Sequence, residues 1–477
     1  MKSEGYRDKY NQHLLHPWGD LSALGKDDWS SIVVRGEGVY VYDAEGNRLL
    51  DGPAGMWCMQ TGYGRSEIAD AVAKQIMNLG YSTAFMLIND REVELAERIA
   101  DKTPGDLNRV YFTTGGSTAV DSALRLCQLA NNIKGQIQRK HIITREKAYH
   151  GSTFLSASVT GKERDKTAMD VIHEGIHFLS APCHFYHPQF ETESEFCDFL
   201  VDELEQKILE IGADNVMCFI AEPILASGGV IVPPADYNFR CWKMVKKYNI
   251  TYIADEVVTA FGRLGHWFAS EEVFGIVPDI IVFAKGVTSG YIPMGGYAVS
   301  EAFLESFTGD NADGCLYSNG YTWSGSPVAC AAALASWDII ENENLLENVL
   351  EVGPYFQDQL RTLIDIPLVG NVRGHGLMAA VEMTIEGHNE EDLLAKDYAI
   401  GEMVDEHCQQ LGLLVRPFIN ICIISPPLII TKKQIDELVS ILRRGLELTL
   451  ADLQDQGIWK NKNNNDGLSP KGETNVR

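Results

Sequence analysis

Short apolar segments, rich in β-branched and aromatic residues, recur through the middle of the chain and alternate with longer stretches of helical periodicity. These segments are residues 109–112, 142–144, 216–221, 250–254 and 280–284. Strands this short and this apolar, joined by crossovers of helical length, indicate a largely parallel sheet with helices on both faces. From about residue 92 to residue 335 the pattern therefore predicts an α/β architecture.

The N-terminal part of the chain has a different pattern. Within residues 38–51, valine and tyrosine alternate, a turn follows at residues 45–47 and apolar residues resume, which predicts a β-hairpin. Residues 66–79 carry apolar side chains on one helical face, with Ser66 placed to cap this helix and Gly80 placed to end it. These elements predict an N-terminal lobe joined to the main body.

The C-terminal third changes character again. Residues 345–363 and 435–446 are amphipathic, and Thr431 and Gln434 stand at capping-box spacing before the second of these helices. The apolar residues 421–424 supply a strand. This mixture predicts a small α+β unit.

Together the patterns predict an α/β protein in which a large domain carries the mainly parallel sheet and both chain ends form a small α+β domain. A chain of 477 residues with 45% hydrophobic residues is long enough to bury one large core and a smaller one. The expected divisions are residues 1–75 and 336–455 for the small domain, 76–335 for the large domain and 456–477 for a flexible tail.

Charge and cysteine usage narrow the partners and the compartment. The chain has 40 basic and 66 acidic residues, a formal charge of −26, which argues against nucleic acid or an anionic membrane as a general partner. Its ten cysteines are scattered without close pairing, as is usual in a reducing compartment. The first ten residues are too polar for a signal peptide, and no apolar stretch reaches about 18 residues. We expect a cytoplasmic protein.

Ionisable residues close three of the predicted strands. Glu222, Asp255 and Lys285 each follow an apolar segment, and they are spaced by roughly thirty residues, the length of one βαβ unit. Singly, Lys285 could be a solvated strand end and Asp255 a helix start. Open α/β sheets place their chemistry at this edge, however, and a lysine beside a carboxylate suits pyridoxal phosphate, which needs an amine for a Schiff base and an anion beside its pyridine nitrogen.

Two further features fit the same cofactor. The glycine-containing residues 113–118 lie between a strand and a helix, where the backbone can approach a phosphate closely; a glycine-rich turn with a threonine cap is the alternative. Tyr149 reaches the same sheet edge after another strand, and Val257 follows Asp255. The pair could sandwich a planar ring, although Tyr149 could equally be a core residue.

In this arrangement the chain resembles the class III aminotransferases, or ω-transaminases, which are pyridoxal-phosphate enzymes of fold type I. The resemblance extends from about residue 33 to residue 446. The matching residues are Asp51-Gly52 with Trp57, 114–117, Tyr149-His150-Gly151, Glu222-Pro223, Asp255-Glu256-Val257, Phe261-Gly262-Arg263, Ala284-Lys285-Gly286, 320–324 and Val415-Arg416-Pro417.

The resemblance implies a role for each of these residues toward the cofactor. Lys285 would form the Schiff base with pyridoxal 5'-phosphate and later move the proton, and Asp255 would pair with the pyridinium nitrogen. The other cofactor-binding residues would be Gly116 and Ser117 at the phosphate, Tyr149 and Val257 on the two ring faces, Glu222 at the strand end, and Thr322 at the phosphate of the partner subunit. A site built from two chains implies a homodimer, or a tetramer.

For the substrate, the resemblance implies that Trp57 and Arg416 line the pocket, with Arg416 binding the carboxylate of an amino or keto acid. Thr118 departs from the family, many members of which have glutamate there. A hydroxyl in place of a carboxylate would suit an anionic head group such as a phosphonate, and drift at a helix start is the alternative. Thr118 is therefore a third expected substrate-binding residue.

We expect an aminotransferase that moves an amino group from a primary amine, with an anionic head group, to a keto acid such as pyruvate. The alternative is a pyridoxal-phosphate ammonia-lyase, which the family also contains, acting on a β-hydroxylated aminoalkylphosphonate such as 1-hydroxy-2-aminoethylphosphonate, or a related phospho-lyase. A third possibility is an interaction protein without cofactor, which would not need Lys285 and Asp255. Cys183, His184 and His187 have zinc-ligand types but only half a site, so no metal is expected.

Overall fold

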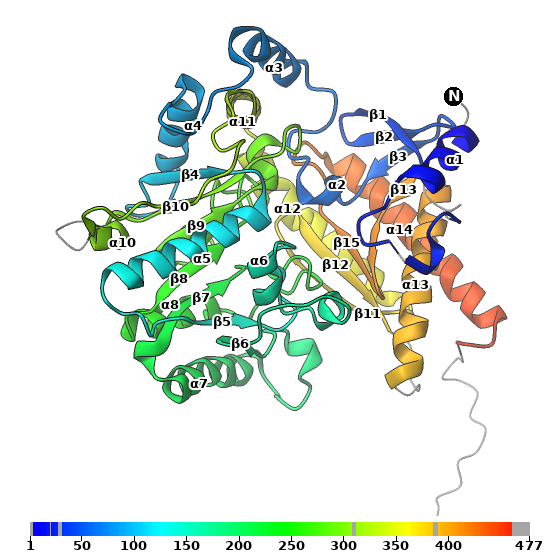
Figure 1. The fold of residues 1–477 in the computed structure, drawn as a ribbon. Coiled ribbons are helices and arrows are strands. Elements are labelled where there is room, and N and C mark those ends of the chain that lie inside the picture. Colours follow the sequence, from blue (N-terminus) through cyan, green and yellow to red (C-terminus); the bar gives the residue numbers. More distant parts are fainter. Residues whose placement is uncertain (1–2, 20, 27–30, 308–311, 385–389, 460–477) are drawn as a thin grey trace, which may run out of the picture.

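A computed structural model gives the fold of residues 3–19, 21–26, 31–307, 312–384 and 390–459 (Figure 1). At its centre is a seven-stranded sheet in the order β4-β10-β9-β8-β7-β5-β6. Its strands are β4 (Arg109–Thr113), β5 (His141–Arg145), β6 (Ile176–Leu179), β7 (Val216–Ala221), β8 (Thr251–Asp255), β9 (Ile280–Phe283) and β10 (Gly295–Val299). All five predicted segments are strands of this sheet, so that prediction is confirmed.

The strands run mostly in one direction. β5 is parallel to β6 and β7, β7 is parallel to β8, and β8 is parallel to β9. β10 is antiparallel to both β4 and β9, so β4 again points the same way as β9. The carboxyl ends of six strands therefore meet at one edge, which is the edge where the ionisable residues were expected.

Helices cover both faces of this sheet. On β9, Ile280 and Val282 pack in a core with α5 (Gly116–Ile133). Ile281 and Phe283 face the opposite core. That second core is built with α4 (Asp90–Ala100), α7 (Glu193–Ile211), α8 (Tyr237–Lys247) and α11 (Pro327–Asn342). Because side chains alternate along a strand, strands covered on both faces are apolar throughout.

The two chain ends build a second unit, which lies beside the large sheet (Figure 1). One of its sheets joins β1 (Val33–Glu37), β2 (Tyr40–Asp43), β3 (Arg48–Asp51) and β13 (Leu413–Leu414). The other joins β11 (Val369–His375), β12 (Met378–Met383), β14 (Arg416–Phe418) and β15 (Ile421–Ile424). Helices α12 (Leu345–Arg361), α13 (Glu390–Leu411) and α14 (Lys432–Asp455) complete it. This confirms the predicted fold class, whereas the numbered domain boundaries stay a prediction.

The local predictions for these ends are largely confirmed. β2 and β3 form the hairpin, and the Asp43 carboxylate stabilises its turn by accepting the N–H groups of Glu45 and Asn47. Thr431 and Gln434 form the predicted capping box at the start of α14. Among the helices of the described part, none is long and apolar enough to cross a membrane. The predicted flexible tail lies outside the described residues, except for its first four.

The helix α3 (Ser66–Leu79) differs from its prediction in two ways. Its N-cap is Arg65, and Ser66 is already helical, so the expected serine cap is wrong. The apolar face is also only partly covered, because Ile68 packs on α11 while Ile76 stays 55% exposed.

Candidate active site

The three ionisable residues that close strands lie on one cavity. Glu222 follows β7, Asp255 ends β8 and Lys285 comes two residues after β9, and these strands are neighbours in the sheet. All three line a cavity of about 1560 Å³. This volume exceeds that of most small-molecule sites, which measure roughly 300–1,000 Å³.

Lys285 is partly buried and forms no ion pair among the described residues. Its backbone has a φ of 41°, a left-handed conformation that a non-glycine residue rarely adopts. Burial lowers the pKa of Lys285; Asp255 and Glu222 oppose this shift, and the Arg416 guanidinium adds to it. The neutral amine, which is the nucleophilic form, is therefore available at lower pH than in a solvated lysine.

Asp255 is held by donors on both carboxylate oxygens. The Val257 N–H donates to Oδ1 at 3.1 Å, and His150 Nδ1 lies 2.7 Å from Oδ2. Thr144 Oγ1 lies 3.2 Å from the other nitrogen of the fully buried His150 ring. The sequence reasoning missed His150 as a functional residue, although it stands beside Tyr149, because the direction of its ring cannot be read from the sequence. These contacts orient a buried anion at the sheet edge.

Glu222 fixes the backbone around the cavity. Its carboxylate accepts the N–H of Tyr149 at 2.9 Å and the N–H of Ala226 at 3.0 Å. Burial raises the pKa of Glu222, the nearby His150 opposes this, and Asp255 adds to it. The carboxylate therefore meets the donors that a buried strand end requires, and it positions Tyr149.

The turn between β4 and α5 forms an anion cradle. A Cβ added to Gly115 would meet no atom within 4 Å, whereas one on Gly116 would lie 3.1 Å from a Val257 methyl group, so the turn packs closely on Val257. Ser117 Oγ accepts the N–H of Ser152 at 3.0 Å. The N-terminus of the 18-residue helix α5 thus lines the cavity, where the first N–H groups of a helix and its partial positive charge can meet an anion.

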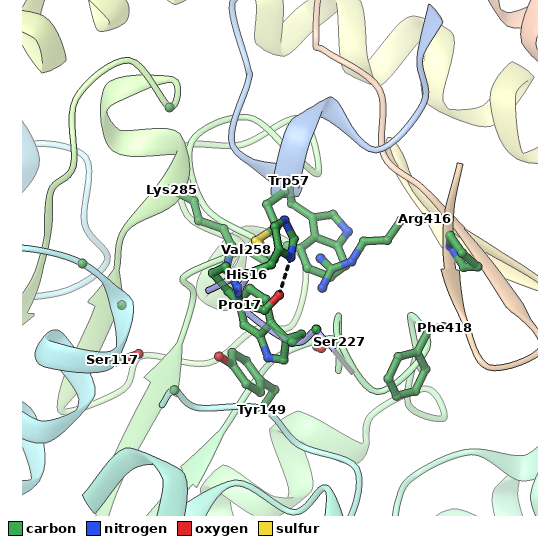
Figure 2. A pocket seen from close by; sticks show the side chains of 18 of the residues that line it. His16, Pro17, Trp57, Ser117, Tyr149, Ser227, Val258, Lys285, Arg416 and Phe418 are labelled. Carbon is green, nitrogen blue, oxygen red and sulfur yellow. Dashed lines mark hydrogen bonds between the residues drawn. The ribbon is translucent and has the colours of Figure 1, made fainter. Parts of the chain in front are cut away.

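Trp57 and Arg416 lie across the cavity from the cradle, with Trp57 between Lys285 and Arg416 (Figure 2). The Arg416 Cζ is 4.4 Å from the Trp57 ring centroid, and the Lys285 Nζ is 5.7 Å from it. Burial lowers the pKa of Arg416. Arg416 Nη1 and Trp57 Nε1 are both buried and find no acceptor among the described residues. Two such donors suit a carboxylate ligand.

Two expected site residues do not reach this cavity in the described structure. The Thr118 hydroxyl donates to the Gly115 carbonyl at 2.9 Å, and the residue is absent from the described cavity wall, so its role at the substrate stays a prediction. Such a local bond is common for a threonine in the first turn of a helix. Thr322 is exposed on another surface, where its carbonyl accepts the Tyr81 hydroxyl at 3.2 Å. Its role at a partner's phosphate stays a prediction.

The structure also brings in residues that the sequence did not indicate. His16 and Pro17, from the N-terminal segment, lie in the middle of the cavity among Trp57, Val258 and Tyr149 (Figure 2). Lys162, Arg164, Ser227 and Phe418 form part of its wall, and Asp43, Glu402, Asp405 and Glu406 line it together with the N-terminal segment. These residues come from loops, from helices and, for Asp43 and Phe418, from the ends of strands in the second unit, and no periodic pattern in the sequence indicates that they share a cavity.

The residues of this cavity fit pyridoxal phosphate. The cofactor requires an amine for its aldehyde, a carboxylate for its ring nitrogen and donors for its phosphate. Lys285, Asp255 and the start of α5 provide these groups on one cavity, and Tyr149 and Val257 line it between them. The glycine at position 115 leaves the open space that a phosphate needs.

Comparison with known proteins agrees with this geometry. Residues 22–446 match the family model "Aminotransferase class-III". The chain is 41% identical to a putrescine–pyruvate aminotransferase from Pseudomonas aeruginosa over 92% of its own length and 95% of the relative's. It is 36% identical to γ-aminobutyrate transaminase 1, mitochondrial, from Solanum lycopersicum, over 88% of this chain and 81% of the relative.

Solved structures with the same fold include several transaminases. An (S)-enantioselective ω-transaminase from Thermomicrobium roseum matches with a TM-score of 0.88 and 35% identity, over 95% of this chain and 99% of that one. The PMP-bound form of an aminotransferase from Vibrio fluvialis matches with a TM-score of 0.88 and 31% identity, over 94% and 98%. The chain belongs to the class III aminotransferases, pyridoxal-phosphate-dependent enzymes of fold type I.

Proposed function

We propose that this aminotransferase moves the amino group of a primary amine to a keto acid such as pyruvate. The proposal rests on the arrangement of Lys285, Trp57 and Arg416 along one cavity. At one end, burial lowers the pKa of the Lys285 amine; at the other, Arg416 Nη1 finds no acceptor among the described residues. One relative is named for putrescine and pyruvate, and another for γ-aminobutyrate. A keto acid carboxylate on Arg416 would bring its carbonyl group toward Lys285.

Each residue then has a defined task. When bound, the cofactor supplies an electron sink for the negative charge that develops on the substrate carbon. Lys285 holds the cofactor, takes the proton from that carbon with its Nζ and returns it after the charge has moved. Asp255, oriented by His150, would offer its negative charge to the ring nitrogen. Trp57 would shield the Lys285 amine from water, and Arg416 would bind the carboxylate of the keto acid.

The anionic head group and the lyase alternative lose the support that Thr118 gave them, because its hydroxyl is turned away from the cavity. Amine panels with and without pyruvate test the proposal. We expect alanine to form in proportion to the amine consumed, and only one turnover without a keto acid. Repeated release of free ammonia without pyruvate would support the ammonia-lyase instead.

We also propose a homodimer. Apolar side chains are strongly exposed on the segment after α3 and near Thr322, including Phe85 at 80% and Met86 at 90%, and the Tyr81 ring contacts Trp323 across the two segments. Groups of exposed large apolar side chains often mark protein–protein contacts. A second copy here would also give Thr322 a partner. Sedimentation should show a dimer or tetramer, and Met86→Glu should weaken it; a stable monomer would contradict this proposal.

The compartment follows from the cysteines. All ten are free thiols, and eight of them are buried. A secreted chain of this composition would be expected to pair some of them. We therefore propose a reducing compartment, the cytoplasm, as its location.

A further inference from the structure

A second cation stands at the substrate end of the cavity. Lys162 follows α6 (Phe154–Val159), leads into the short helix Glu163–Lys166 and lines the same cavity as Arg416. Only 9% of its side chain is exposed. Burial disfavours the ammonium form of a lysine, so the side chain is stabilised by groups of opposite charge, of which Asp165, 3.3 Å away, is one.

The backbone that carries Lys162 is fixed. Gly161 donates its N–H to the Ala148 carbonyl at 2.8 Å and accepts the Lys147 N–H at 2.8 Å. A side chain at Gly161 would collide with the Arg145 carbonyl, so the close approach depends on glycine. Lys162 is thus held beside Tyr149, whose ring centroid is 5.5 Å from its Nζ.

Positive charge gathers around one aromatic ring. The Lys162 Nζ is 4.2 Å and the Arg164 Cζ is 4.8 Å from the Phe418 ring centroid, and Arg416 precedes Phe418 by two residues on β14. One carboxylate, Asp165, lies 3.3 Å from both Lys162 and Arg164. Three cations, Lys162, Arg164 and Arg416, are therefore grouped at this end of the cavity in a chain whose net charge is −26. Burial lowers the pKa of Lys162, Asp165 opposes this, and Arg164 and Arg416 add to it.

Ser227 completes the group. Its Oγ lies 3.3 Å from the Lys162 Nζ, a long contact, and the residue lines the cavity. Figure 2 shows Ser227, Phe418 and Arg416 on the side of the cavity away from Ser117. The group therefore belongs to the substrate end and not to the phosphate cradle.

We propose that Lys162 and Ser227 form a second carboxylate-binding subsite in this cavity, beside the one at Arg416. The inference rests on the proposed transamination and makes Lys162 a specificity-determining residue for it. The carboxylate could come from the far end of an ω-amino acid donor or from the keto acid acceptor. Butan-1-amine and 4-aminobutanoate differ by that one group and so separate the donor's carboxylate from the rest of its chain.

The test follows the two half-reactions of the cofactor-loaded enzyme by its absorbance. The Lys162→Met variant is compared with a control, Lys166→Met, which removes a positive charge four residues away. Lys166 lies outside the described cavity wall, and its Nζ is 4.1 Å from the Phe178 ring centroid. Loss of a charge-assisted bond should lower the efficiency of the Lys162→Met variant about 10- to 100-fold with 4-aminobutanoate or with pyruvate. Butan-1-amine should be unaffected, and Lys166→Met should match the parent throughout.

The half-reaction that slows identifies which substrate carries the bound carboxylate. A slower reaction with 4-aminobutanoate points to the amino donor, and a slower reaction with pyruvate points to the acceptor. Lys162→Arg should retain most of the efficiency. An equal loss with butan-1-amine, or no loss with either carboxylate, would overturn the subsite. Calorimetry with unreactive butanoate in the Arg416→Ala background, where only the second subsite remains, gives a readout independent of turnover. If Arg416→Ala binds butanoate and Arg416→Ala combined with Lys162→Met does not, the subsite stands even where pyruvate is not aminated, an outcome that would refute only the proposed function.

Should Lys162→Met fail to load cofactor, Ser227→Ala provides the second variant. It keeps the charge and removes one neutral bond, so a loss of about three- to tenfold with the same carboxylate partner is expected. An unchanged efficiency in Ser227→Ala together with unchanged butanoate binding would count against the subsite.

Discussion

Replacing His150 with leucine tests how the site orients its buried carboxylate. The His150 ring is fully buried and touches Asp255 through Nδ1 at 2.7 Å, while the Val257 N–H supplies the bond to the other carboxylate oxygen. Leucine has a similar volume and no donor. The change therefore removes one of the two donors that the described structure gives Asp255, with little loss of packing.

The magnitude follows from that bond. A hydrogen bond to a charged group contributes about 1.5–3 kcal/mol, and leaving a buried acceptor unpaired adds to the cost. A carboxylate that has lost one of its two donors is less firmly oriented toward the ring nitrogen. We expect cofactor affinity and turnover to fall by about 10- to 100-fold each.

The assay is a double-mutant cycle. Cofactor affinity, by equilibrium dialysis, and turnover are measured for His150→Leu, Asp255→Asn and both together. If His150 acts through Asp255, its replacement should have little further effect once the carboxylate is gone. Thr144→Val, which removes only the contact with the far ring nitrogen, should cost less than His150→Leu. An equal loss in both backgrounds would refute a positioning role for His150.

Three other predictions can be checked directly. Lys285→Ala should abolish turnover and leave the cofactor bound only noncovalently, as borohydride reduction and mass spectrometry would show; full activity would contradict its assignment. Arg416→Ala should slow the half-reaction with pyruvate about 10- to 100-fold and spare amination by a simple arylalkylamine; equal losses would make Arg416 structural. Burial raises the pKa of Asp405 to about 6, so between about pH 4 and pH 6 the folded state keeps a proton that the unfolded state has lost. The free energy of unfolding therefore falls by about 3 kcal/mol as the pH rises through that window. Asp405→Asn should therefore stabilise the protein toward urea at pH 7.5 but not below about pH 4, and an equal gain at both would contradict this.

The fold was readable where the chain is apolar on both sides of a strand. β7, β8 and β9 are nearly continuous apolar runs, and their ends had to carry Glu222, Asp255 and Lys285 to one edge because parallel strands share a direction. β10 was missed since it begins with Gly295 and Gly296, a weak strand signal. Position 295 requires glycine because a Cβ there would lie 2.6 Å from the Gly115 backbone, which is too close for any side chain.

From the strand pattern, the sequence predicted only those site residues that the ends of the parallel strands bring to one edge of the sheet. Thr118 shows the limit: its position at the start of α5 was predictable, but its hydroxyl turns back to the Gly115 carbonyl instead of into the cavity. Whether a side chain at a helix start faces a ligand or its own turn depends on packing around it. Lys162 and His16 come from loops, and loops reach a cavity by three-dimensional folding that leaves no period in the sequence.

Charge is distributed along the cavity in a way that couples substrate binding to Lys285. Burial lowers the pKa of Lys285, and the Arg416 guanidinium lowers it further. A carboxylate bound to Arg416 cancels that repulsion, so it should raise the pKa of Lys285 and favour the amine as a proton acceptor once the acid is in place. Labelling of Lys285 by an acid anhydride in the cofactor-free protein measures this. Its pH midpoint should rise with butanoate and should already be raised in Arg416→Ala, where the further rise with butanoate should be smaller. A midpoint that falls, or that shifts equally in Arg416→Ala, would show that the two groups titrate independently.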